Sequence, residues 1–167
     1  KADVLCRKAI SSHPSAPDLW TVRNRRIVAL LGLWKLKGEY RYFASAVEEA
    51  KATMKTELPP GTDVIARFCL ARESLRHAEI DSESVIRGFA EADGKQASAP
   101  ELAAAALLAL DVGERKLHED YRRAYLDAYA EHPAMWTITA FFLERYHRYW
   151  MYHPPFVAGW TYGRRQG

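Results

Sequence analysis

The sequence predicts an all-α fold in which antiparallel helix pairs stack as a solenoid of about seven or eight helices. Apolar side chains recur every three or four residues along most of the 167-residue chain, which is the period of a helix that buries one face. The alternation of apolar and polar residues that is typical of strands is nearly absent. Proline and glycine interrupt the helical pattern at short intervals, as the turns between paired helices require.

A proline-rich break separates the first two helices. The first helix is expected over residues 1–12, and the prolines of residues 13–17 end it because proline disfavours helix in the residue before it. The second is expected over residues 17–37 and ends at Gly38, since glycine suits a helix exit. Gly32 is interpreted as a site of helix packing. The predicted inward face consists of Trp20, Ile27, Leu31 and Trp34, and the side chains predicted largely on the surface include Arg23, Arg25 and Arg26.

The next three helices follow with short turns. The third is expected over residues 39–58, where the prolines at 59 and 60 stop it. Because the turn at Gly38 is so short, the second and third helices must lie antiparallel. Thr62 or Asp63 is expected to cap a fourth helix that reaches Ala78, and Asp81 or Ser82 a fifth that reaches Ala92.

The C-terminal half continues the helical pattern. Residues 93–100 are the most linker-like stretch, but they are short enough for a turn within one domain. Further helices are expected over residues 101–111, 114–130 and 134–152, the last of which ends before two prolines. We therefore expect one helical-repeat domain over residues 1–167, with an irregular aromatic and basic tail from residue 152.

Composition limits the functions that this chain can have. The formal net charge of +3 is too small to indicate nucleic-acid binding, and no apolar run approaches the roughly 18 residues that cross a membrane. Lys1 is not an initiator methionine and no signal-peptide core follows it, so we expect a piece of a longer, soluble protein, with the cytoplasm favoured. Cys6 and Cys69 are expected to be free buried thiols, although a disulfide between them stays open.

Paired helices recur at roughly 35 to 40 residues, the period of helical-repeat arrays. The stretch from Ile27 to Ala50 resembles one tetratricopeptide repeat (TPR), and it departs from that family at Phe43, where a small residue is usual. The positions that carry the resemblance are Ile27, Leu30, Leu31, Trp34, Gly38, Tyr40, Val47 and Ala50. The resemblance implies a TPR-like α-solenoid.

Such arrays present a concave surface lined mainly by the first helix of each pair, and in families of this kind the groove usually binds peptides or protein segments. In the register that the resemblance implies, the side chains pointing into the groove are Arg25, Val28, Lys35 and Leu36. The alternative is that these are solvated or packed residues of a scaffold that holds other domains in place.

The C-terminal segment from Phe141 onward interleaves aromatic and cationic side chains. The candidate binding residues within it are Arg145, Arg148, Trp150, Trp160 and Tyr162. Three interpretations remain open. The segment caps the end of the stack, docks against a partner or another domain of the same polypeptide, or stacks on a carbohydrate or a nucleic acid.

No motif indicates catalysis. The chain has no glycine-rich phosphate loop, no nucleophile elbow, and no second histidine at zinc-site spacing from His118. Glu48, Glu49 and Glu73 are interpreted as helix-surface carboxylates. The sequence thus predicts a non-catalytic protein-interaction or scaffolding module without a cofactor or a metal. The alternative is a ligand-binding domain that uses the C-terminal aromatic and arginine segment.

Overall fold

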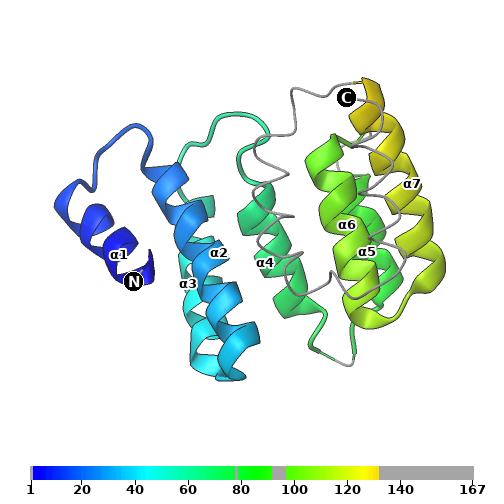
Figure 1. Cartoon of the computed structure of the whole chain (residues 1–167), viewed down its shortest axis with the longest axis horizontal. Coiled ribbons are helices and arrows are strands. Elements are labelled where there is room, and N and C mark those ends of the chain that lie inside the picture. Colours follow the sequence, from blue (N-terminus) through cyan, green and yellow to red (C-terminus); the bar gives the residue numbers. More distant parts are fainter. Residues whose placement is uncertain (1, 78, 92–96, 132–167) are drawn as a thin grey trace. The chain divides into compact units, whose positions relative to one another are not determined.

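The computed structural model describes residues 2–77, 79–91 and 97–131, and every regular element within these ranges is an α-helix (Figure 1). Seven helices follow one another in the described residues, which confirms the predicted all-α class. The chain divides into two compact units between Ile80 and Asp81. The single helical-repeat domain over residues 1–167 stays a prediction. The division does not coincide with the linker-like residues 93–100. Each unit is described by itself.

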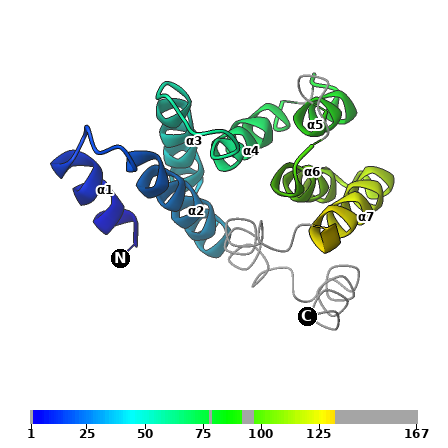
Figure 2. The same ribbon diagram turned by 90° about the horizontal axis from the view of Figure 1, so that it is seen from above.

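The first unit contains four helices, α1 (Ala2–Ser12), α2 (Leu19–Lys37), α3 (Tyr40–Met54) and α4 (Val64–Ser74). Each helix packs against the next, and α2 also contacts α4. Both views show α1 against α2, on the side away from α4 (Figures 1 and 2). Consecutive packing of this kind is solenoid-like, because each helix buries its apolar face on its sequence neighbours.

The turn between α2 and α3 forms as the sequence predicts. Gly38 has a φ of +69°, in the left-handed region that glycine adopts without strain, and its N–H donates to the Trp34 carbonyl at 2.8 Å. The packing role predicted for Gly32 is wrong, because a Cβ built at that residue would meet nothing within 4 Å. Among the largest fully buried side chains between the helices are Ile27, Leu30, Leu31, Phe43 and Phe68.

Two helices of the first unit end earlier than predicted. α3 ends at Met54 rather than at residue 58, and the Thr56 hydroxyl donates to the Thr53 carbonyl at 2.7 Å. Leu58 precedes Pro59, so the helical conformation is disfavoured there as well. α4 ends at Ser74 rather than at residue 78, because the chain continues in tighter turns with hydrogen bonds between residues three apart.

The second unit contains α5 (Ser82–Ala90), α6 (Ala99–Val112) and α7 (Arg115–Glu131), and α6 contacts both of the others. Asp81 caps α5 as predicted, by accepting a hydrogen bond from the Glu83 N–H at 3.1 Å. α6 starts two residues earlier than predicted, since Pro100 fits a first helical turn. Every residue from Leu102 to Ala109 is buried, so α6 is apolar on all sides and forms the centre of this unit.

Candidate functional site

Two groups of polar and aromatic side chains stand out, and both lie in the first unit. The ion-pair cluster consists of Asp3 on α1, Arg23 and Arg26 on α2, and Glu49 on α3. The second group, the arginine–aromatic edge, consists of Trp34, Tyr40, Phe43, Arg72 and Arg76.

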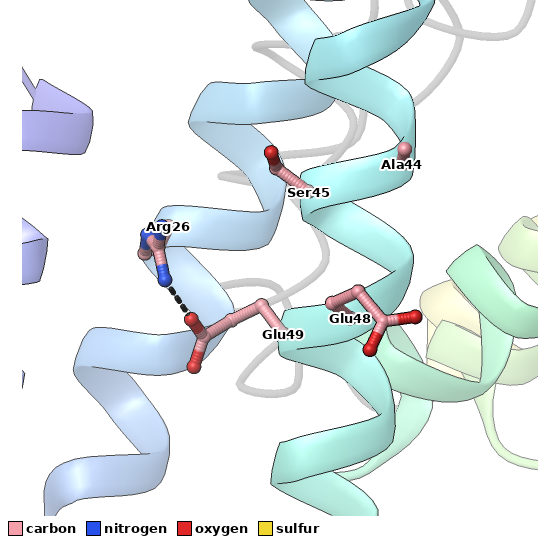
Figure 3. Close-up of a pocket in the computed structure, with 5 residues that line it drawn as sticks. All are labelled: Arg26, Ala44, Ser45, Glu48 and Glu49. Carbon is pink, nitrogen blue, oxygen red and sulfur yellow. Dashed lines mark hydrogen bonds and ion pairs between the residues drawn. The ribbon is translucent and has the colours of Figure 1, made fainter.

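The ion-pair cluster joins three helices. Arg23 and Arg26 are three residues apart and share one face of α2. Arg23 Nη1 lies 2.8 Å from Glu49 Oε1, Arg26 Nη1 binds the other oxygen of the same carboxylate, and Arg26 Nε donates to Asp3 Oδ1 at 2.9 Å. Figure 3 shows Arg26 and Glu49 pointing toward one another, whereas Glu48 points away from them. The cluster thus ties α1, which buries no residue of its own, to α2 and α3.

The electrostatics keep Asp3 and Arg26 charged. Burial acts to raise the pKa of Asp3, but hydrogen bonds from Arg26 and Arg7 outweigh burial and lower that pKa. Burial acts to lower the pKa of Arg26, yet its hydrogen bond to Asp3 and the charge of Glu49 raise it. With both pKa values shifted away from neutrality, these two groups have no means of moving protons near pH 7.

The cluster corrects two sequence-based interpretations. Glu49 was interpreted as a surface carboxylate, but its side chain is only 5% exposed. Arg23 and Arg26 were placed largely on the surface, but their side chains are 17% and 18% exposed. Charged side chains are rarely buried to this degree unless they are paired. Here the pairs join different helices, so the local sequence does not reveal them.

An open hollow of about 360 Å³ lies beside the cluster (Figure 3). Its lining residues are Arg26, Ala44, Ser45, Glu48 and Glu49. The Glu48 carboxylate is 73% exposed and pairs with Lys51 at 2.9 Å, so that it does belong to the helix surface. Ser45 is the one hydroxyl in this lining, and no histidine accompanies it. The hollow thus lacks the paired nucleophile and base of a serine-type catalytic site.

The arginine–aromatic edge forms where α2 and α4 end and α3 begins. Arg72 Cζ lies 4.8 Å from the centre of the Trp34 ring, and Arg76 Cζ lies 4.4 Å from that of Tyr40. The Trp34 and Phe43 ring centres are 4.5 Å apart, which joins both stacks into one group. Arginine over an aromatic face is a favourable cation–π arrangement. Arg72 lies in the last turn of α4, and Arg76 lies in the tighter turns that follow it.

Further cations and an apolar side chain surround the turn between α2 and α3. Lys37 Nζ and Arg41 Cζ lie 5.6 and 5.0 Å from the centre of the Tyr42 ring. Arg41 also pairs with Glu39 at 2.6 Å. The Leu36 side chain is 66% exposed. This end of the unit therefore combines an exposed apolar side chain with several cations.

The groove residues predicted from the sequence fall into different environments. Leu36 is exposed and Lys35 is partly buried at the end of α2 that carries the arginine–aromatic edge. Arg25 is exposed but lies about three turns away along α2. Val28 is only 6% exposed, so it is a core residue and its side chain is not available to a partner.

The C-terminal candidates lie outside the described residues. They are Arg145, Arg148, Trp150, Trp160 and Tyr162. Arg72 and Arg76 were not among the functional residues predicted from the sequence. Their spacing of four residues is visible in the sequence, but their aromatic partners lie on α2 and α3 and are brought close only by packing.

Two general features hold for the described ranges. No three side chains of histidine, cysteine, aspartate or glutamate are grouped there in a way that could hold a metal ion. None of the described helices has the length and apolar character needed to span a membrane. Comparison of the chain with protein-family models, with curated proteins and with solved structures finds no match.

Proposed function

We propose that this chain is a non-catalytic protein-interaction module of helical-repeat type, which binds a peptide or protein segment at the end of the first unit where α2 meets α3. The observation that carries the proposal is the exposure of Leu36 and Tyr40, 66% and 48%, next to the cations of the same helix ends. A contiguous exposed apolar surface rimmed by polar side chains is typical of an interaction site.

The residue types at this end support the same function. Tyrosine, tryptophan and arginine contribute most often to the binding energy of protein interfaces. Here they are fixed by the buried Phe43, which is 0% exposed and contacts the rings of Trp34 and Tyr40. A surface held in place by the core loses little conformational entropy when a partner binds.

A quantitative affinity capture tests the proposal. The whole 167-residue chain is compared with its Leu36→Glu variant and with a Leu5→Glu variant as the matched control. Both leucines lie on helices of the first unit and have almost the same exposure, 66% for Leu36 and 65% for Leu5. The melting temperature of each variant is measured first, so that lost folding is not read as lost binding.

We expect specific proteins to be retained by the wild type and by Leu5→Glu and to be lost with Leu36→Glu. If the same proteins are retained by all three chains, the binding surface lies elsewhere and the proposed site is wrong. If no chain retains a specific protein, the interaction function itself is refuted and a spacer role takes its place.

A further inference from the structure

Positive charge is concentrated at the end of the first unit that carries the arginine–aromatic edge. The side chains there are five cations, Lys35, Lys37, Arg41, Arg72 and Arg76, and three carboxylates, Glu39, Glu73 and Glu79. The cations at this end therefore outnumber the carboxylates by two. A local field of this sign attracts acidic partners over a distance of about 10 Å at 0.1 M salt.

The position of Arg76 allows it to bind a carboxylate of a partner. Its Cζ lies over the Tyr40 ring, 4.4 Å from the ring centre, and 5.2 Å from the centre of the Phe43 ring. A guanidinium carries its N–H donors along its edges, where a carboxylate can accept two hydrogen bonds. Within the described residues, Arg76 pairs with Glu73, whose Oε2 lies 3.9 Å from Arg76 Nε, the outer limit of an ion pair.

Lys37 and Arg41 add two more positions for negative charge. In the part of the chain that the structure describes, Lys37 contacts the Tyr42 hydroxyl and ring and forms no ion pair. Among the described residues, Arg41 pairs with Glu39, and both of these side chains are well exposed, 70% and 42%. Exposed ion pairs of this kind contribute little stability, so a partner carboxylate can replace Glu39 at small cost.

We propose that the partner of this surface is a short acidic segment of another protein that also carries an apolar side chain. Its carboxylates bind Lys37, Arg41 and Arg76, and its apolar side chain packs on Leu36. This inference rests on the proposed function, because it names the chemistry of the partner for the same surface. The charge complementarity and the exposed leucine carry it.

A nucleic acid fits this surface less well. Bases bind single-strand sites by stacking on open aromatic faces. Here Phe43 is fully buried, and guanidinium groups already lie over Trp34 and Tyr40. An exposed leucine also has no counterpart on a phosphate backbone.

Fluorescence anisotropy with the whole chain tests the inference. The probe is a short fluorescein-labelled peptide in which glutamate alternates with leucine. The comparison probes are the same peptide with glutamine in place of glutamate, and a labelled oligouridine. The binding variant is Lys37→Glu with Arg76→Glu, and the control is Lys8→Glu with Lys55→Glu, which changes the net charge equally at exposed lysines outside this surface. Lys37→Glu alone is included, because this side chain is exposed and its loss does not disturb the core.

We expect the glutamate peptide to bind, the binding variant to weaken its Kd about tenfold or more, and the control to change it by no more than about twofold. Added salt should weaken this binding as well. Equal binding of the glutamine peptide, or an equal effect of both double variants, refutes an acidic partner at this surface. If oligouridine binds more tightly than the glutamate peptide and the binding variant removes this binding, the partner is a nucleic acid and not an acidic peptide. No binding of the glutamate peptide also refutes the inference. Failure of the proposed function is seen separately, in affinity capture that Leu36→Glu does not change.

Discussion

Replacing Glu49 with alanine leaves Arg23 and Arg26 without the carboxylate that both of them bind. Removing one partner of a fully buried ion pair costs about 3–5 kcal/mol, because the other charge remains buried and uncompensated. The two arginine side chains are 17% and 18% exposed, so water compensates part of the loss. We therefore expect Glu49→Ala to lower the free energy of unfolding by about 2–3 kcal/mol and the melting temperature by roughly 10 °C.

The chain provides its own control for this measurement. Glu48 is the same residue type at the preceding position of α3, but its side chain is 73% exposed and pairs with the exposed Lys51. Urea denaturation followed by circular dichroism, with thermal melts in parallel, should show Glu48→Ala within about 2 °C of the wild type. If Glu49→Ala and Glu48→Ala have the same small effect, the cluster does not stabilise the first unit, and the reasoning from burial is wrong.

Three further predictions follow from individual residues. Cys69 is fully buried, which raises the pKa of its thiol to about 12. Alkylation of the native protein at pH 8 should therefore modify Cys6 and spare Cys69. Equal alkylation rates of the two cysteines, measured by peptide mass spectrometry, would contradict this. Gly38→Ala should cost about 1 kcal/mol in urea denaturation because its φ is +69°, whereas Gly32→Ala, inside α2 with open space at Cβ, should stabilise by up to about 1 kcal/mol. A change of the same sign for both glycines would refute this contrast. The pKa of Asp3 is lowered from 3.8, so its stabilising contribution is present above that pH and is lost as the pH falls through the lower folded value. Asp3→Asn should therefore reduce the melting temperature at pH 7 and lose its effect in strong acid, and a constant difference across this range would argue against the ion pair.

The helices could be predicted from the sequence because helix signals are local. Each backbone hydrogen bond joins residues four apart, and the apolar period and the breaking residues lie within the same short window. Gly38 ends α2 and Asp81 caps α5, as predicted. The early end of α3 also has a local cause in Thr56 and the prolines that follow, although the predicted end lay directly before those prolines.

The candidate surfaces depended on contacts between helices, which no window of sequence contains. Glu48 and Glu49 are neighbours in the same stretch of sequence, yet Glu49 binds two arginines of α2 and Glu48 is solvated. Val28 was predicted to line a groove, but it is buried. Helical spacing predicts which side chains share a face, but it does not predict which other helix packs on that face.

The sequence by itself thus determined the helical class, the turns and most helix ends, since these depend on backbone conformation and on neighbouring residues. The tertiary structure alone decided which charges are buried and paired and which rings receive the guanidinium groups of Arg72 and Arg76. The physical reason is that burial and ion pairing depend on distances between helices. Side chains far apart in the chain reach those distances only after the helices have packed.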